Sequence, residues 1–177
     1  TTFWKGPDMM LKTARILKSI GIDFEWIIAG KMDLNLKKVV EHHEKCRFED
    51  VNLKLIGFTT PDKLINYLCN CTMYVHTAYI ENSPNSICEA QILGVPIVST
   101  NVGGISTLLD GNGDLVPAND PWQMANAIID LANNKDKMIR YSKNGRKIAS
   151  LRHSPIVIKE QLLNCYEVLS RQSLSEK

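Results

Sequence analysis

Three consecutive segments decide the fold: ENSPNSICEA at residues 81–90, GVPIVST at 94–100 and VGG at 102–104. Glu81 follows an apolar run and lies in a loop, and Ser83 and Pro84 supply the N-cap and the first position of a helix. Glu89 lies one to two turns into that helix, which Gly94 ends. The apolar residues after this glycine form the next strand. The segments therefore predict two strands joined by a helix whose N-terminus is open to an anion.

Short apolar runs alternate with amphipathic segments along the rest of the chain. Strands are predicted at 24–29, 52–56, 72–77, 96–99 and 115–116. Helices are predicted at 11–20, 34–46, 61–69, 84–93, 122–133, 135–149 and 155–170. This order favours an α/β fold in which a parallel sheet has helices on both faces. The polar residues from Arg171 onward are expected to form a loose tail.

Composition limits the class of protein. The chain has 177 residues, 44% of them apolar, which suits one domain with a sizeable core. Its net charge of +2 is too small to indicate a nucleic acid or a membrane surface as a partner. No apolar run approaches the roughly 20 residues that cross a bilayer, so no transmembrane segment is predicted. The chain starts at Thr1 rather than at methionine, so we expect an upstream region to precede it.

The cysteines indicate a reducing compartment. The five are scattered along the chain and odd in number, which is typical of buried thiols in a reduced cytoplasmic protein. Cys69 and Cys71 form the one close pair, but this pair lacks zinc-finger spacing and a second pair. No metal site is therefore predicted.

The Glu81 loop has the features of an anion site. In an open α/β sheet, ligands bind outside the carboxyl ends of the strands, and this loop leaves such an end. The free N–H groups of Asn85, Ser86 and Ile87 and the helix dipole can then bind phosphate without a glycine-rich loop. The carboxylate of Glu89 can accept hydrogen bonds from vicinal hydroxyls. A sugar nucleotide is a ligand that has both a phosphate and vicinal hydroxyls.

Other residues complete this hypothesis, each with a plainer alternative. Lys5 can balance the charge of the two carboxylates and a diphosphate. Gly103 and Gly104 can form a tight turn that lets a ligand approach the backbone, or a turn with no further role. His76, at a strand end, either borders the crevice or is a core histidine, which is the commoner case. The helix start and both glutamates could likewise be a cap and solvated side chains.

The same residues resemble a known family, the retaining glycosyltransferases of family 4, also called group 1. Its signature contains E-G-x-P-x-S-x-x-E-A, a G-x-P-V-V strand and a V-G-G turn, which here are ENSPNSICEA, GVPIVST and NVGG. GNGDLVP at 111–117 is similar to the family's G-x-x-G-L-V-P. Lys5-Gly6 resembles its K-G, and Ala29-Gly30 its strand-ending glycine. The resemblance covers nearly the whole chain.

The resemblance implies the GT-B architecture of two facing Rossmann-like domains, one binding the donor and the other the acceptor. Residues 1–152 would be the donor-binding domain, and 153–177 a C-terminal helix with the loose tail. The acceptor domain is absent from this chain. The family's strand ending in Gly-Arg, ahead of the lysine, is absent as well. Since that strand is central in the usual order, we expect a doubly wound sheet with a gap, or one filled by another chain or by rearrangement.

The resemblance also implies a role for each matching residue. Lys5 would neutralise the donor diphosphate and Glu81 would face the transferred sugar, so both are assigned to catalysis. Asn85 and Ser86 would contact phosphate through their backbone, and Glu89 would hold the ribose. The remaining donor-binding positions are expected near the base or at the glycine turn: Gly57, Phe58, Gly103 and Gly104.

The implied activity is transfer of a hexosyl group from a nucleoside-diphosphate sugar to an acceptor hydroxyl, with retention at the anomeric carbon. No cofactor or metal is expected, because Lys5 and the helix N-terminus can stabilise the leaving diphosphate. A carbohydrate or lipid-linked acceptor would bind through the missing domain, which could also carry membrane association. The isolated chain is expected to be inactive. The alternatives are a non-catalytic nucleotide-sugar-binding module and an epimerase or phosphorylase of the same architecture.

Overall fold

The computed structural model describes residues 2–175, in which strands and helices alternate as the sequence predicts. The strands are β1 Trp26–Ala29, β2 Leu53–Gly57, β3 Tyr74–His76, β4 Ile97–Thr100 and β5 Asp114–Val116. The helices are α1 Pro7–Ser19, α2 Leu34–Glu44, α3 Pro61–Asn70, α4 Asn85–Leu93, α5 Ile105–Leu108, α6 Pro121–Asn133, α7 Lys135–Arg152 and α8 Pro155–Ser175. Two 3₁₀ turns, η1 Phe3–Lys5 and η2 Glu49–Val51, precede α1 and β2.

The strands form two separate parallel sheets. One contains β1 and β2, and the other has the order β3-β4-β5. In the second sheet His76 lies opposite Ser99, and Thr100 opposite Val116, so the carboxyl ends of its strands share one edge. Within residues 2–175 no strand joins β1 to β3. The predicted gap in the sheet is therefore confirmed.

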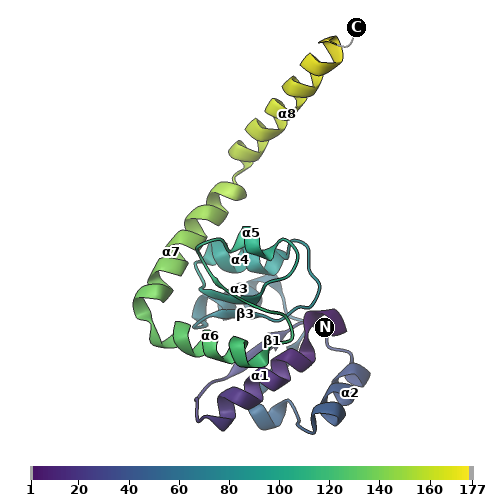
Figure 1. Cartoon of the computed structure of the whole chain (residues 1–177), viewed down its shortest axis with the longest axis vertical. Helices are drawn as coiled ribbons and strands as arrows, with labels where there is room; N and C mark the ends of the chain where they lie inside the picture. The colour runs from purple at the N-terminus through teal and green to yellow at the C-terminus, as the bar shows by residue number, and fades with distance from the viewer. Residues whose placement is uncertain (1, 176–177) are drawn as a thin grey trace.

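Helix α1 packs against both sheets and joins them (Figure 1). Leu11 and Ala14 belong to the cluster that contains Ile28 of β1. Met9, near the start of the same helix, packs with Val98 and Val116 of the β3-β4-β5 sheet. Because these α1 side chains are fully buried, one helix gives the divided sheet a shared core.

The β3-β4-β5 sheet is covered on both faces, as predicted. Ile97 of β4 packs with Ile87 of α4 and Ile105 of α5. Val98, the next residue, points to the other face and packs with Met124 of α6. Each of these side chains is fully buried, which stabilises the fold by about 1.5–3 kcal/mol per side chain.

Several boundaries differ from the predicted ones. Helix α1 begins at Pro7, one turn before the predicted start, because proline is well suited to the first helical position. The four-residue helix α5 was not predicted, since its sequence is too short to show a period. Helix α8 continues to Ser175, beyond its predicted end, so the predicted loose tail starts as helix. Residues 176–177 of that tail lie outside the described residues.

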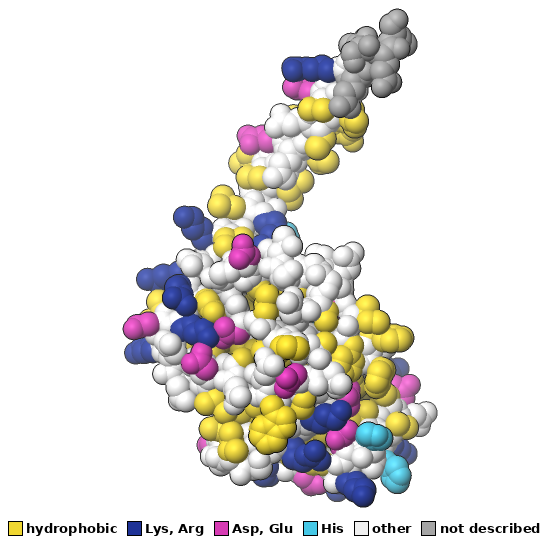
Figure 2. Space-filling model, viewed as in Figure 1, with side chains coloured by type: hydrophobic (Ala, Val, Ile, Leu, Met, Phe, Trp, Pro, Cys, Tyr) yellow, Lys and Arg dark blue, Asp and Glu magenta, His cyan; other side chains and the backbone are white. Residues whose placement is uncertain are grey.

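Helix α8 extends away from the body of the molecule (Figure 1). Its exposed apolar side chains include Ile156, Leu162, Tyr166 and Leu169, and such side chains are visible along the projecting helix in Figure 2. Most helical stability in proteins comes from tertiary packing. Helix α8 therefore draws little stability from the rest of the described chain.

Candidate functional site

The 3₁₀ turn η1 is fastened to the loop that follows β3. The Tyr79 N–H donates to the Trp4 carbonyl at 2.8 Å, and the Thr77 hydroxyl donates to the Lys5 carbonyl at 2.9 Å. These bonds place the Lys5 ammonium beside Glu81, to whose Oε2 atom it donates. The structure thus brings together two candidate residues that are 76 positions apart in the sequence.

A glycine allows this close approach. Gly6 has a φ of +67°, and a Cβ atom at this position would lie 2.1 Å from the carbonyl oxygen of Thr77. An alanine here would therefore clash with the backbone of the β3 loop and adopt a left-handed conformation. Glycine at position 6 therefore lets η1, the turn that carries Lys5, pack closely against the loop after β3.

The Gly103-Gly104 turn also packs against this loop. The Gly104 N–H donates to the Asn82 carbonyl at 3.0 Å. A Cβ atom on Gly103, whose φ is +54°, would lie 1.7 Å from the Glu81 carbonyl oxygen. The two glycines therefore support the backbone of the loop that carries the Glu81 side chain. Whether a ligand also approaches them stays a prediction.

The start of α4 differs from the predicted one. Pro84 occupies the N-cap position and the helix begins at Asn85, with no side-chain cap from Ser83. The Ile87 N–H bonds to the Pro84 carbonyl at 3.1 Å, so its predicted availability to an anion is wrong. The N–H groups of Asn85 and Ser86 make no hydrogen bond within residues 2–175. Two amides, rather than three, are left for a ligand.

Both glutamates lie near the same phenol. Tyr74 of β3 lies near the side chain of Ser86, at the start of α4. Burial raises the pKa of Tyr74, the Ser86 side chain lowers it, and the charges of Glu89 and Glu81 raise it further. Both carboxylates are therefore near enough to the Tyr74 hydroxyl to affect its pKa. The Glu81 side chain is partly buried, whereas Glu89 is exposed.

Glu81 is held as a carboxylate. Burial alone would raise its pKa, but the Lys5 ammonium, the Asn82 N–H and His76 lower it, and the net shift is downward. The Asn82 N–H donates to Glu81 Oε1 at 3.3 Å. The side chain of Glu81 is only 16% exposed, so its charge depends on these partners.

His76 lies next to this carboxylate, a position that the sequence left open. It is buried, with 5% of its surface exposed, and it also borders the candidate site. Its Nε2 atom is 3.7 Å from Glu81 Oε2 and has no hydrogen-bond partner. Burial lowers the pKa of His76 to about 4, so the ring is neutral near pH 7. The sequence signal for this residue was only its place at the end of a strand.

Gly57 and Phe58 lie on the other sheet, at the carboxyl end of β2. The Gly30 N–H donates to the Gly57 carbonyl at 2.8 Å, and the Phe58 side chain is 87% exposed. Within residues 2–175 no hydrogen bond or ion pair joins them to Lys5 or Glu81. Their predicted role near the base therefore stays a prediction.

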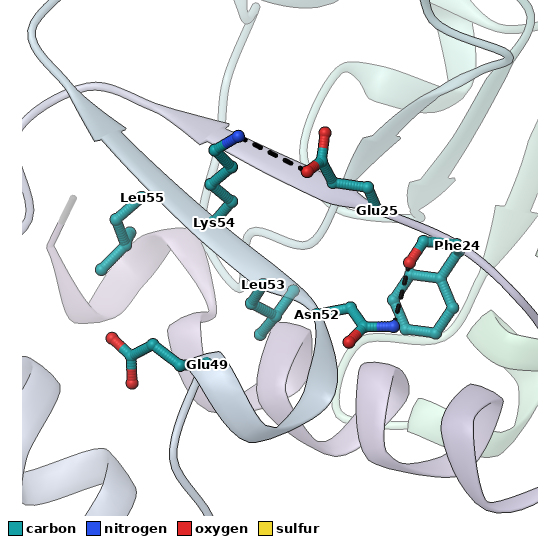
Figure 3. Close-up of a pocket in the computed structure, with 7 residues that line it drawn as sticks. All are labelled: Phe24, Glu25, Glu49, Asn52, Leu53, Lys54 and Leu55. Carbon is teal, nitrogen blue, oxygen red and sulfur yellow. Dashed lines mark hydrogen bonds and ion pairs between the residues drawn. The ribbon is translucent and has the colours of Figure 1, made fainter.

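A shallow hollow lies at the opposite, amino ends of β1 and β2 (Figure 3). Its polar groups already have partners: Lys54 Nζ lies 3.5 Å from Glu25 Oε2, and the Asn52 amide donates to the Phe24 carbonyl at 3.1 Å. Because ligands of α/β sheets bind at the carboxyl ends of the strands, we do not assign function to this hollow.

Among the described residues, no group of three or more histidine, cysteine and acidic side chains could hold a metal ion. None of the helices in that part of the chain has the length and apolar character that crossing a membrane demands.

Residues 1–148 match the family described as Glycosyl transferases group 1. A capsular polysaccharide biosynthesis glycosyltransferase of Staphylococcus aureus, CapM, is 26% identical over 171 residues, which are 96% of this chain and 44% of that protein. A D-inositol 3-phosphate glycosyltransferase of Paenarthrobacter aurescens is 33% identical over 135 residues, covering 72% of this chain and 32% of that one. The chain thus spans less than half the length of these curated relatives.

Solved structures share the fold. The Anabaena protein Alr3699/HepE, crystallised with UDP-glucose, superposes with a TM-score of 0.77 at 23% identity, over 95% of this chain and 46% of that one. The C-terminal domain of a group 1 glycosyl transferase, LpcC of Francisella tularensis, superposes with a TM-score of 0.73 at 19% identity. That match covers 86% of this chain and 81% of the domain. The second match indicates which half of such proteins this chain resembles.

Proposed function

Because this chain belongs to the group 1 glycosyl transferase family, we propose that it is the donor-binding part of a retaining glycosyltransferase. The parent protein would move a hexosyl group from a nucleoside-diphosphate sugar to an acceptor hydroxyl. The acceptor, a carbohydrate or a lipid-linked sugar, would bind through residues outside this chain. Since the chain spans 44% of CapM and 46% of the Anabaena protein, we expect it to be inactive in transfer by itself.

One observation supports this proposal above the others. The Lys5–Glu81 pair lies beyond the carboxyl end of β3. Lys5 comes from η1, and Glu81 from the loop that leads to the unbonded N–H groups of Asn85 and Ser86. An ammonium and two amides at a helix N-terminus form a site for a diphosphate. The exposed Glu89 carboxylate, one to two turns along the same helix, can accept hydrogen bonds from ribose hydroxyls.

In the proposed reaction each group has one task. Lys5 and the two amides stabilise the diphosphate as the bond to the sugar breaks. Glu81 orients the sugar, and the departing phosphate takes the proton of the incoming hydroxyl. Because fixed positive charge and dipoles already face the leaving group, the transfer needs no divalent metal. The likeness to a protein solved with UDP-glucose supports a nucleotide-sugar donor and makes UDP the first probe.

The proposed ribose contact makes a quantitative prediction for Glu89. We expect Glu89→Ala to weaken UDP binding about 10-fold, because a hydrogen bond to a charged group contributes about 1.5 kcal/mol or more. Isothermal titration calorimetry with the 177-residue chain measures the affinity. Glu167→Ala, on the projecting helix α8, is the matched control and should leave the affinity unchanged.

A second nucleotide identifies the group that Glu89 contacts. 2′-Deoxy-UDP lacks one of the two ribose hydroxyls, so the unmodified chain should bind it more weakly than UDP. Glu89→Ala should bind the two nucleotides with similar affinity. If the variant still discriminates between them as well as the unmodified chain does, the ribose role of Glu89 is wrong.

A further inference from the structure

We propose that His76 is a positioning residue that holds Glu81 in place when a bound diphosphate draws Lys5 away from it. This inference rests on the proposed function, because the diphosphate is the donor's leaving group. In the described structure Lys5 is bonded to Glu81 Oε2, the atom that also lies nearest to the histidine ring. One carboxylate oxygen therefore has two candidate partners, of which only the lysine is bonded to it.

The His76 ring lies close enough to Glu81 to form a hydrogen bond after a small movement. Its Nε2 atom is buried, has no hydrogen-bond partner and lies 3.7 Å from Glu81 Oε2. An unbonded buried nitrogen costs free energy unless it gains a partner in another state of the protein. A movement of less than 1 Å by the carboxylate would bring the pair within hydrogen-bond distance, roughly 3 Å.

The hydrogen bond of the other ring nitrogen, Nδ1, indicates which tautomer the neutral ring adopts. Its Nδ1 atom lies 3.3 Å from the Ser99 hydroxyl, and that hydroxyl donates its proton to the Thr100 carbonyl at 3.0 Å. The Ser99 oxygen is thus left to accept a hydrogen bond from Nδ1–H. In the neutral ring this leaves Nε2 without a proton and facing a carboxylate. Protonation of Nε2 would satisfy both nitrogens at once.

Two charges act on the ring, from two different segments. Burial is the largest effect on the pKa of His76, and it lowers this pKa. Of the two charges, Glu81, in the loop after β3, raises the pKa, whereas Lys5, in the η1 turn, lowers it. Strand β4 contributes the Ser99 hydroxyl, and on β3 the Tyr74 ring lies 6.4 Å away. Removing the lysine from Glu81 therefore raises the pKa of His76. Binding of a diphosphate should then be accompanied by proton uptake.

The first experiment needs no nucleotide. The pKa of His76 is measured by NMR from the chemical shift of its ring protons in the unmodified chain and in Lys5→Met, with His76→Gln identifying the signal. We expect the pKa to rise by about one unit or more in Lys5→Met. Lys159→Met, a lysine on the projecting helix α8, should leave it unchanged. If the pKa of His76 is unaltered in Lys5→Met, the proposal that His76 replaces Lys5 as the partner of Glu81 is overturned.

The second experiment adds UDP. Calorimetry at about pH 5.5, in buffers with different enthalpies of ionisation, counts the protons taken up on binding. We expect uptake by the unmodified chain that is absent in His76→Gln; equal uptake by both would overturn the inference. If UDP fails to bind, the proposed function and the diphosphate trigger are both overturned. The titration of Lys5→Met still decides by itself whether His76 can replace the lysine.

Two substitutions separate positioning from packing. Gln can donate a hydrogen bond from roughly the place of Nε2, whereas Leu has a similar size and no donor. We expect His76→Leu to bind UDP about 10-fold more weakly than His76→Gln, because only the former loses the bond to Glu81. Thermal unfolding of both variants is the control for folding. Equal affinities in two folded variants would show that His76 has only a packing role.

Discussion

Replacing Gly103 by alanine is expected to lower the free energy of unfolding by about 2–4 kcal/mol and to displace the loop that carries Glu81. The added Cβ atom would lie 1.7 Å from the Glu81 carbonyl oxygen, a distance that no local adjustment of a flexible side chain can relieve. The backbone of the loop or of the glycine turn must move. Since the loop orients Glu81 toward Lys5, we expect UDP binding by this variant to fall below detection.

A matched substitution separates this clash from the cost of a left-handed backbone. Gly111 has a similar φ, +67° against +54°, but a Cβ atom there would meet nothing within 4 Å. Gly111→Ala should therefore cost only about 1 kcal/mol and leave UDP binding intact. Urea unfolding and calorimetry measure the two quantities. A similar loss of stability in the two variants would contradict the proposed contact between the glycine turn and the loop.

The sequence predicts the architecture because its signals are local. Pro84 and Gly94 mark the two ends of α4 to within one residue, and the apolar runs mark the five strands. The resemblance also predicts a gap in the sheet, and the described strands do form two separate sheets, β1-β2 and β3-β4-β5. Patterns of this kind depend on neighbouring residues, which the sequence shows directly.

The contacts that assemble the site are not visible in the sequence. The bond from the Thr77 hydroxyl to the Lys5 carbonyl joins residues 72 positions apart, and no local pattern marks it. The bond between the Ile87 N–H and the Pro84 carbonyl tightens the first turn of α4, a detail that a helix period cannot reveal. His76 is a similar case, because its role depends on the unbonded state of one nitrogen.

The second large effect is expected for Lys5→Met, which should weaken UDP binding about 100-fold. A charge-assisted hydrogen bond to phosphate contributes about 1.5–3 kcal/mol. The substitution also leaves the Glu81 carboxylate, now without its ammonium, close to the diphosphate. Repulsion between the two adds to the loss. Calorimetry with UDP measures the effect, and Lys159→Met is the control for a change of net charge.

Two comparisons test whether Lys5 acts on the diphosphate and through Glu81. UMP has one phosphate fewer, so Lys5→Met should weaken its binding much less than that of UDP. Adding Glu81→Gln to Lys5→Met removes the unneutralised carboxylate and should restore UDP affinity about 10-fold. These two results would follow only if the ammonium lies between the carboxylate and the phosphates. Equal losses for UMP and UDP, together with no recovery in the double variant, would place Lys5 outside the site.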